Sequence, residues 1–483
     1  MKALEPSVLW NNFQSICGIP HPSKHEEKIV SWLCDWAKQH NISVRKDETG
    51  NVILSKPATP GMENRKGVIL QAHIDMVPQK NADKNHDFTK DPIEMMVGED
   101  GWVRANGTTL GADDGIGCAA ALSVLESTDI AHGPIEVLIT IDEETGMTGA
   151  FGLKTGEFKG DILLNLDSET EGELYVGCAG GLDANISFDY KQMPVPANTN
   201  AFQLEVKGLR GGHSGMDIDC GNGNANKIII RFLKLIVRKY QVALASINGG
   251  SLRNAIPREA FAVILVPSNN VEAVKQEMQA FLPIVQKELS ATEPDLTMNL
   301  LPADMPNHII EQQVAENMID AVYACPNGVM RMSDSMANLV ETSTNLAIVK
   351  SNGNTIDISC LLRSSVDSAK EDLMEMMESL FRLAGATSKF TGGYPGWKPN
   401  MDSPILHTMM DTYKRLYGTD AKIMAIHAGL ECGLLGGKYP HWDMISFGPT
   451  ILNPHSPNER VNIESVEKFW RFLVETLKNI PVK

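Results

Sequence analysis

The fold of this chain is decided by the stretch IEVLITIDEE at residues 135–144, an apolar run that ends in three acidic residues. Three further apolar runs lead into His, Asp or both, at residues 68–75 (VILQAHID), 161–167 (DILLNLD) and 444–455 (MISFGPTILNPH). Short apolar runs bounded by turn residues are typical of buried strands in a mostly parallel sheet. Sites in such sheets form beyond the carboxyl ends of the strands. The pattern therefore predicts a metal centre at one sheet edge, and hence a metalloenzyme.

The chain of 483 residues is too long for one compact core. Residues 41–180 alternate strand and helix patterns, which is typical of a parallel sheet. Between residues 187 and 395 the strands alternate apolar with polar residues, as half-buried antiparallel strands do. We predict an α/β catalytic domain formed by residues 1–186 and 396–483, with helices on both faces of a mostly parallel sheet. An inserted α+β lid domain at residues 187–395 interrupts it.

Composition limits the partners and the compartment. Sixty acidic and 43 basic residues give a net charge of −17, which argues against a nucleic-acid or anionic-membrane surface. The amino terminus lacks the apolar core of a signal peptide, and the apolar stretch 228–237 carries two cations and is too short to span a bilayer. Eight cysteines without a CxxC pair are typical of reduced thiols. We expect a cytoplasmic protein with no nucleic-acid or membrane partner.

His73 is the first candidate metal ligand, and Asp75 follows it by two residues. A metal-binding imidazole usually donates its other ring N–H to a carboxylate or carbonyl, so Asp75 is a candidate to orient His73. An isolated His-x-Asp would more often be a core histidine beside a surface aspartate. The acidic residues at the ends of the other predicted strands make metal binding the favoured interpretation of His73.

Asp113 and Asp114 stand in the stretch GADDGIG at residues 111–117, ahead of a strong helix pattern. Asp is a favoured helix N-cap, so one of the pair could serve only that purpose. A carboxylate on a loop at the sheet edge could instead bridge two metal ions. Asp113 is the candidate for the bridge because it is farther from the helix.

Glu143 and Glu144 follow a predicted strand directly, so their side chains point in different directions. One could bind metal, while the other stays free as the general base that a hydrolase needs. Two solvated glutamates in a loop are the alternative. Asp167 adds an oxygen donor and His455 a second imidazole. Two imidazoles and three carboxylates suit two ions that share one carboxylate, with Zn²⁺ favoured and Mn²⁺ or Co²⁺ as substitutes.

Five motifs occur in a fixed order, at residues 73–75, 111–115, 142–146, 165–169 and 454–455. Together they resemble the motif set of the two-zinc exopeptidases related to carboxypeptidase G2 and the bacterial tripeptidases. The resemblance runs nearly end to end. It implies one zinc ion held by His73, Asp113 and Asp167, and another held by Asp113, Glu144 and His455. It also implies that Glu143 is the general base and that Asp75 orients His73.

The resemblance assigns roles in the inserted domain too. It implies that His213 reaches an active site, often that of a partner subunit, and polarises the scissile carbonyl. It implies that Asn254 and Arg363 bind the free carboxylate of the substrate, for which the planar arginine fork is suited. For His427, substrate contact and a structural role are equally favoured interpretations. Without the resemblance, His213 would be an exposed loop histidine and Arg363 a solvated cation at a strand end.

The function implied by the resemblance is a metallo-dipeptidase that hydrolyses unblocked dipeptides. A preference for C-terminal histidine, including β-alanyl-histidine, and a homodimer formed through the lid domain are implied with it. One alternative is an N-acyl amino acid amidohydrolase of the same fold. The other is a non-catalytic metal-binding or peptide-binding protein, against which Glu143 speaks because a binder needs no general base.

Overall fold

The computed structural model describes residues 4–483. The chain divides into two compact units, one formed by Met1–Gly177, Pro399–Ala425 and Leu430–Lys483, and the other by Cys178–Lys398 and Ile426–Gly429. The second unit begins at Cys178 rather than at 187, because the strand Gly180–Asp189 pairs along its whole length with the strand Thr355–Ser364. It also takes in residues 426–429, which we had predicted to lie in the first domain. No helix among residues 4–483 is long and apolar enough to cross a membrane.

The first unit contains most of the predicted strands that end in candidate ligands. Its helices are α1 (Ser7–Cys17), α2 (Glu27–Gln39), α3 (Ala112–Glu126), α4 (Glu143–Gly146), α5 (Thr148–Gly152), α10 (Pro404–Tyr417), α11 (Glu431–Lys438) and α12 (Ile463–Lys478). Its strands are β1 (Ser43–Lys46), β2 (Val52–Lys56), β3 (Val68–His73), β4 (Met95–Val97), β5 (Trp102–Ala105), β6 (Ile135–Thr140), β7 (Ile162–Asn165), β8 (Glu173–Cys178), β22 (Lys422–Ile426), β23 (Asp443–Ser446), β24 (Ile451–Leu452) and β25 (Arg460–Asn462).

The eight-stranded sheet of the first unit has the order β1-β2-β6-β3-β7-β23-β8-β22. Its central strands are parallel, since β3 pairs in parallel with β6 and β7, and β7 with β23. The neighbours β2 and β8 run antiparallel to β6 and β23. Strands β3 and β7 are buried along their whole length, as their continuous apolar runs predict. The carboxyl ends of the four parallel strands therefore meet at one edge.

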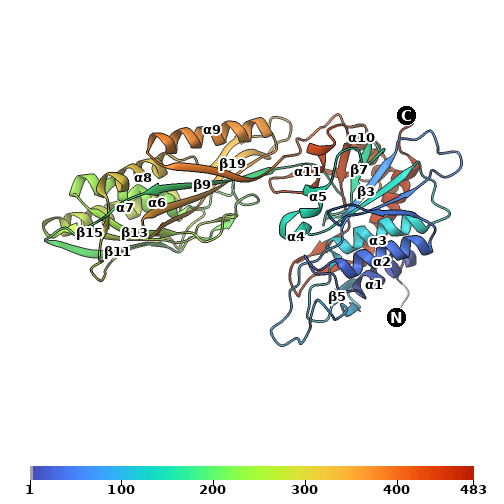
Figure 1. Ribbon diagram of the computed structural model, residues 1–483, viewed down its shortest axis with the longest axis horizontal. Helices are drawn as coiled ribbons and strands as arrows, with labels where there is room; N and C mark the ends of the chain where they lie inside the picture. Colours follow the sequence, from blue (N-terminus) through green and yellow to red (C-terminus); the bar gives the residue numbers. More distant parts are fainter. Residues whose placement is uncertain (1–3) are drawn as a thin grey trace. The chain divides into compact units, whose positions relative to one another are not determined.

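Helices pack against this sheet from two sides. In Figure 1, α1, α2 and α3 lie together on the opposite side of β3 and β7 from α10 and α11. Helix α10 shows how local sequence sets the boundaries of an element. The side chain of Ser403 accepts a hydrogen bond from the Leu406 N–H, Pro404 occupies the first turn, and Gly418 ends the helix in a left-handed conformation. The predicted α/β architecture of this domain is confirmed.

The second unit is an α+β arrangement around one large antiparallel sheet. Its strands are β9 (Gly180–Asp189), β10 (Gln192–Met193), β11 (Thr199–Lys207), β12 (Gly212–His213), β13 (Ala243–Gly249), β14 (Ala255–Ile256), β15 (Ala260–Pro267), β16 (Thr297–Pro302), β17 (Ile309–Ile310), β18 (Gly328–Met332), β19 (Val340–Asn352), β20 (Thr355–Ser364) and β21 (Thr387–Tyr394). Its helices are α6 (Ala225–Tyr240), η1 (Ser268–Asn270), α7 (Val271–Glu288), α8 (Gln312–Ala324) and α9 (Asp367–Leu383).

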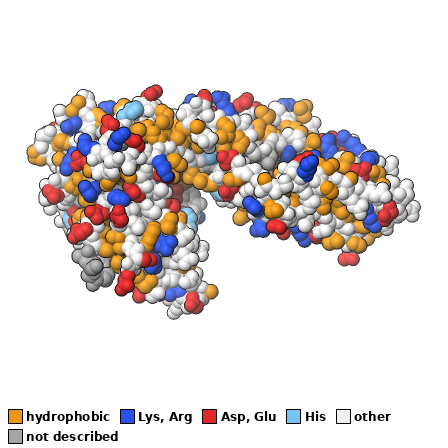
Figure 2. All heavy atoms as spheres, turned by 180° about the vertical axis from the view of Figure 1, so that it is seen from behind, with side chains coloured by type: hydrophobic (Ala, Val, Ile, Leu, Met, Phe, Trp, Pro, Cys, Tyr) orange, Lys and Arg blue, Asp and Glu red, His pale blue; other side chains and the backbone are white. Residues whose placement is uncertain are grey.

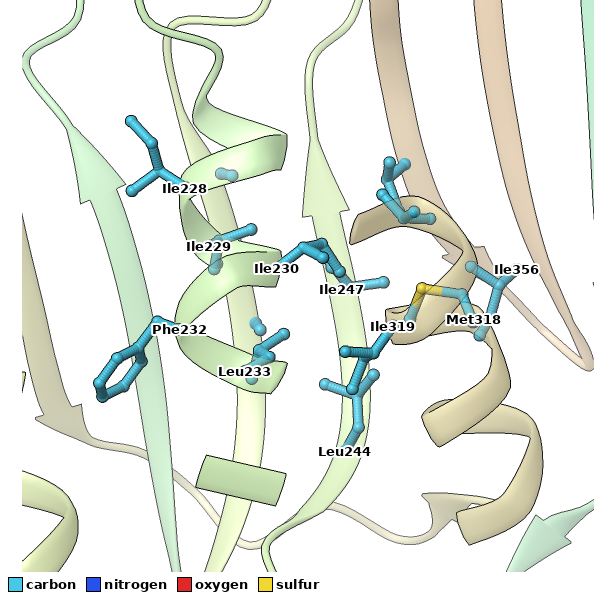
Figure 3. Close-up of a cluster of buried hydrophobic side chains, with 14 of the residues drawn as sticks. Ile228, Ile229, Ile230, Phe232, Leu233, Leu244, Ile247, Met318, Ile319 and Ile356 are labelled. Atoms are coloured by element: carbon cyan, nitrogen blue, oxygen red, sulfur yellow. The ribbon is translucent and has the colours of Figure 1, made fainter. Parts of the chain in front are cut away.

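The core of the second unit lies between its helices and this sheet, whose main path is β16-β11-β15-β13-β19-β20-β9-β21. Asn224 caps helix α6 by accepting a hydrogen bond from the Lys227 N–H, and the apolar positions of the helix recur at helical spacing. Figure 3 shows Ile230 of this helix next to Ile247 of β13, and Leu244 of β13 next to Ile319 of α8. Burying such a side chain contributes roughly 1.5–3 kcal/mol, so the α6 stripe fixes the helix on the sheet.

The surface agrees with the modest excess of acidic residues. Acidic, basic and apolar side chains are intermingled over the face that Figure 2 shows. The formal net charge of −17 is thus distributed rather than gathered in one block on that face.

Candidate functional site

Three side chains meet at the carboxyl edge of the first unit's sheet: His73 at the end of β3, Asp113 near the start of α3, and Asp167 beyond β7. His73 Nε2 lies 3.1 Å from Asp113 Oδ1 and 3.3 Å from Asp167 Oδ1. Their ligand atoms all lie within 4.8 Å of one another. This group matches the first predicted set of metal ligands.

A second group shares Asp113 and adds Glu144 and His455. His455 Nε2 lies 3.1 Å from Asp113 Oδ2 and 3.0 Å from Glu144 Oε2. The other oxygen of Glu144, Oε1, is buried without a hydrogen-bond partner among residues 4–483. The two oxygens of Asp113 thus face two different histidines, which is the arrangement that a bridging carboxylate requires.

The donor set fits metal ions. Two ligand atoms bound about 2.1 Å from one tetrahedral ion lie about 3.4 Å apart, close to the 3.0–3.3 Å separations within these groups. Burial and neighbouring carboxylates, opposed by His73, raise the pKa of Asp167 to about 7. Hydrogen bonds to Asp113 and Glu144 raise the pKa of His455 to about 11. Ionised carboxylates this close together repel one another, and bound positive charge would offset that repulsion.

Asp75 contacts both His73 and the loop that carries Glu143 and Glu144. His73 Nδ1 lies 3.1 Å from the carbonyl oxygen of Asp75 and 3.5 Å from its carboxylate. The carboxylate itself accepts the backbone N–H groups of Glu143 at 2.9 Å and Glu144 at 3.2 Å, and the hydroxyl of Ser23 at 2.8 Å. Asp75 therefore holds the His73 ring mainly through its carbonyl, and the loop of the two glutamates through its carboxylate.

Glu143 lies at the margin of the cluster. It forms a further group with His73 and Glu144 whose ligand atoms are within 4.8 Å of one another. Burial raises the pKa of Glu143 well above its ordinary value, and the charges of Asp167, Glu431 and Glu144 add to this effect. Its carboxyl group therefore holds a proton more readily than an exposed glutamate does.

Asp113 and Asp114 have different roles, helix capping for one and a position in the cluster for the other. Asp114 Oδ1 accepts the N–H of Gly117 at 3.1 Å, and Oδ2 accepts the N–H of His73 at 3.3 Å, so Asp114 caps the helix and Asp113 faces the cluster. Both residues have non-helical backbone angles, which places Asp113 ahead of the regular helix.

Two buried glutamates at this edge were not predicted. The Glu431 carboxylate accepts hydrogen bonds from Gln71 and Thr140, both at 2.7 Å, and burial raises its pKa to about 7. Glu459 accepts backbone N–H groups of residues 110–113. The only signal for Glu431 was an acidic residue within the run Leu430–Leu435, and Glu459 follows His455 in an ordinary polar loop.

The substrate-binding candidates of the inserted domain gather within the second unit. Arg363, on β20, is buried rather than solvated, and its Nε and Nη2 lie 3.4 Å from the hydroxyl of Ser214. His427 Nε2 lies 2.7 Å from the hydroxyl of Ser343. Burial and the charge of Arg363 lower the pKa of His427 to about 3, so His427 is neutral at physiological pH.

His213 is half-buried beside them. Its Nδ1 accepts the backbone N–H groups of Gly215 at 3.2 Å and Met216 at 3.1 Å, and its pKa is lowered by burial and by Arg363. A neutral ring whose Nδ1 accepts carries its proton on Nε2. His213 can therefore donate a hydrogen bond to a ligand from Nε2.

Gly215 and Asn254 complete this group. A side chain at Gly215 would collide with the carbonyl oxygen of His427, so the two segments touch. Asn254 is exposed, and its carbonyl oxygen accepts the N–H of Ser214 at 2.8 Å. Asn254, His213, Arg363 and His427 therefore share one region of the second unit.

Comparisons with known proteins agree with these features. The sequence pattern of peptidase family M20/M25/M40 matches residues 69–479 of this chain. The chain is 48% identical to the cytosol non-specific dipeptidase of Escherichia coli (strain K12), over all of this chain and 99% of that protein. Its fold matches the crystal structure of aminoacylhistidine dipeptidase from Vibrio alginolyticus with a TM-score of 0.95, over 99% of this chain and 98% of that one. The two sequences are 51% identical. A tripeptidase from Staphylococcus aureus, 17% identical with a TM-score of 0.57 over 99% of each chain, shares the fold. The predicted resemblance is thus confirmed, and this chain belongs to peptidase family M20/M25/M40 and is a hydrolase.

Proposed function

We propose that this protein is a cytoplasmic two-zinc dipeptidase that hydrolyses unblocked dipeptides and prefers histidine as the second residue. The observation that carries this proposal is the position of Asp113, whose two carboxylate oxygens each lie 3.1 Å from a different histidine. Glu143 lies close to His73 and Glu144, and its pKa is raised, mainly by burial. A binding protein would have no need of a general base at the position of Glu143.

His73, Asp113 and Asp167 would hold one ion, and Asp113, Glu144 and His455 the other. Imidazole and carboxylate donors at these separations suit Zn²⁺, with Mn²⁺ or Co²⁺ as substitutes. When bound, such a pair of ions polarises the scissile carbonyl and lowers the pKa of the attacking water. Asp75 would fix the His73 ring and the glutamate loop for that purpose.

Glu143 would act as the general base and then as the general acid. Its carboxylate takes a proton from the attacking water and passes it to the amine nitrogen that leaves when the peptide bond breaks. The buried position of Glu143 and the neighbouring carboxylates favour its protonated form, which suits the second transfer.

The second unit would supply the groups that recognise the substrate. His213 carries its proton on Nε2 and would donate it in a hydrogen bond to the carbonyl oxygen as negative charge develops there. Arg363 and Asn254 would bind the free carboxylate of the dipeptide, because a buried guanidinium pairs well with a carboxylate. We assign His427, which is neutral and lies 2.7 Å from the hydroxyl of Ser343, to the same substrate-binding group.

The substrate class draws support from the relatives. The Escherichia coli relative is named a cytosol non-specific dipeptidase, and the Vibrio alginolyticus structure is an aminoacylhistidine dipeptidase. We propose a dipeptidase that accepts several dipeptides and cleaves those with C-terminal histidine best, β-alanyl-histidine among them. The word cytosol in the name of the first relative supports a cytoplasmic location.

A substrate panel tests this proposal. The protein, reconstituted with zinc, is assayed with alanyl-histidine, β-alanyl-histidine and alanyl-alanine, and with N-acetyl-histidine and N-acetyl-alanine. We expect turnover of the free-amine dipeptides, fastest with C-terminal histidine. Preferential hydrolysis of the N-acetylated compounds would favour the amidohydrolase alternative instead, and no turnover with either zinc or manganese would favour a binding protein.

We also propose that the protein is a homodimer through the second unit and that His213 serves the partner subunit's site. Glu143→Gln and His213→Ala chains, each inactive alone, are mixed and the heterodimer is isolated with two affinity tags. Recovered activity, up to about one working site per heterodimer, supports a shared site. An inactive heterodimer means that each chain completes its own site.

A further inference from the structure

Glu459 joins two distant segments of the first unit. Its side chain is buried, with 2% of the residue exposed. Oε2 accepts the backbone N–H groups of Leu110 at 2.7 Å and Gly111 at 3.1 Å. Oε1 accepts those of Ala112 at 2.7 Å and Asp113 at 3.4 Å. One carboxylate therefore receives four consecutive backbone N–H groups from a segment about 350 residues away in the sequence.

The segment at residues 110–113 presents these groups for a physical reason. Residues 110–113 lie ahead of the regular part of α3, so their N–H groups need partners outside the helix. Gly111 has a φ of 71°, a left-handed conformation that turns successive N–H groups toward one point, as in an anion-binding nest. The carboxylate of Glu459 occupies that point. The last of the four N–H groups belongs to Asp113, whose side chain faces both histidines of the cluster.

Glu459 is also tied to the other side of the cluster. It stands four residues after His455, and its N–H donates to the carbonyl of Ser456 at 3.0 Å, which closes a turn in this loop. Directly after Glu459, β25 pairs with β5, the strand that precedes residues 110–113. The loop of His455 and the loop of Asp113 are thus joined by one strand pair and one carboxylate.

We propose that Glu459 is a positioning residue that holds the Asp113 loop and the His455 loop at the separation needed for the ion bound by Asp113, Glu144 and His455. This inference rests on the metal centre of the proposed function. The other ion would keep His73 and Asp167, which stand at the ends of neighbouring strands and do not depend on Glu459. The role requires both carboxylate oxygens as acceptors, and not merely a side chain of that volume.

The variant Glu459→Gln separates these two explanations. Glutamine fills the same volume, but its amide group turns an N–H₂ donor toward two backbone N–H groups, which leaves them unpaired in a buried place. If Glu459 only fills space, the change is silent. The matched control is Glu136→Gln in the same unit. Glu136 Oε2 also accepts two backbone N–H groups, from Lys159 at 2.9 Å and Gly160 at 2.8 Å, but at the opposite end of β6 from the cluster.

The first measurement is zinc affinity, by competition with a chromophoric chelator, for the wild-type, Glu459→Gln and Glu136→Gln chains. We expect one of the two ions to bind about 10–100-fold more weakly in Glu459→Gln, the usual effect of losing a group that supports a ligand. The second ion, and both ions in Glu136→Gln, should bind as in the wild type. Unchanged affinities in Glu459→Gln, or equal weakening of both ions, would overturn the inference.

The second measurement needs no metal. Hydrogen–deuterium exchange of the metal-free chains should show faster exchange for residues 110–113 in Glu459→Gln and not in Glu136→Gln; unchanged protection overturns the inference. If wild-type protein binds no ions, the metal centre itself is wrong, and this exchange result still decides whether Glu459 clamps the loop. If Glu459→Gln does not fold, Glu459→Asp takes its place, because its carboxylate is one methylene too short to reach all four N–H groups. Faster exchange at residues 110–113 together with one weakened ion then supports the role, and wild-type exchange and affinities contradict it.

Discussion

Asp113 and His455 lie 342 residues apart in the sequence, and their side chains meet with 3.1 Å between Asp113 Oδ2 and His455 Nε2. The contact joins the amino-terminal and carboxyl-terminal parts of the first unit, which the second unit separates in sequence. The candidate metal centre therefore exists only when both parts have folded together. Metal binding should accordingly stabilise the discontinuous unit as a whole.

Metal content is the first testable consequence. The wild-type chain should bind two ions, because five donor side chains with one shared carboxylate suit two ions better than one. Asp113→Ala should lose both ions, whereas His455→Ala should mainly weaken one. Elemental analysis of reconstituted, chelator-washed protein measures this. One tight ion with full activity in the wild type would contradict the dinuclear centre.

The second consequence concerns His213 in the second unit. His213→Ala should lower kcat far more than it raises KM, because a donor aimed at developing charge acts mainly in the transition state. A loss on the order of 10²–10³-fold in kcat is expected for a donor of this kind. Steady-state kinetics with alanyl-histidine measures it, and metal content serves as the control. A change confined to KM would contradict this role.

Arg363 offers the contrasting variant. Arg363→Ala should chiefly raise KM for dipeptides with a free carboxylate and have little effect on the corresponding dipeptide amides. The buried guanidinium lies by the Ser214 hydroxyl, one residue after His213, which supports this assignment. Equal effects on acids and amides would mean that Arg363 has a structural role.

The metal-ligand candidates could be predicted from sequence because their positions follow local rules. His73 and Asp167 stand at or just beyond the ends of buried apolar strands, and Asp113 stands on a glycine-flanked turn before a helix. Parallel strands bring their carboxyl ends to one edge, so short-range patterns were enough to group these side chains.

The supporting residues could not be predicted in this way. Glu459 and Glu431 act through contacts with residues more than 290 positions away, and nothing in their local sequence marks them as buried. The boundary at Cys178 reflects the pairing of β9 with β20, and residues 426–429 contact the second unit through Gly215 and Ser343. Both are tertiary facts. The burial of Arg363 belongs to the same class, since a strand-end arginine is usually solvated.

A pH-dependent part of the stability should come from His427. Its pKa is about 3 in the folded chain against an ordinary value of 6.5, because burial and Arg363 oppose the charged form. The unfolded chain therefore binds the extra proton below pH 6.5, and the free energy of unfolding falls as pH drops from 6.5 toward 3. Between pH 7 and pH 5 the loss from His427 is at most about 2 kcal/mol.

Urea unfolding of the metal-free protein at pH 7 and pH 5 checks this. In His427→Asn the loss of stability between the two pH values should be smaller than in the wild type. His25→Asn, at an exposed position, is the matched control and should leave the difference as it is. An equal loss in His427→Asn and the wild type would mean that His427 takes up a proton as easily folded as unfolded.

Glu143→Gln, assayed for zinc content and for turnover on the same sample, tests the central claim most directly. Glutamine keeps the shape of Glu143 but cannot accept the proton of the attacking water. We expect two bound ions and a kcat lower by roughly 10²–10⁴-fold, the usual contribution of general-base catalysis. Near-normal kcat, or loss of the ions with the activity, would contradict the division of roles between Glu143 as base and Glu144 as ligand.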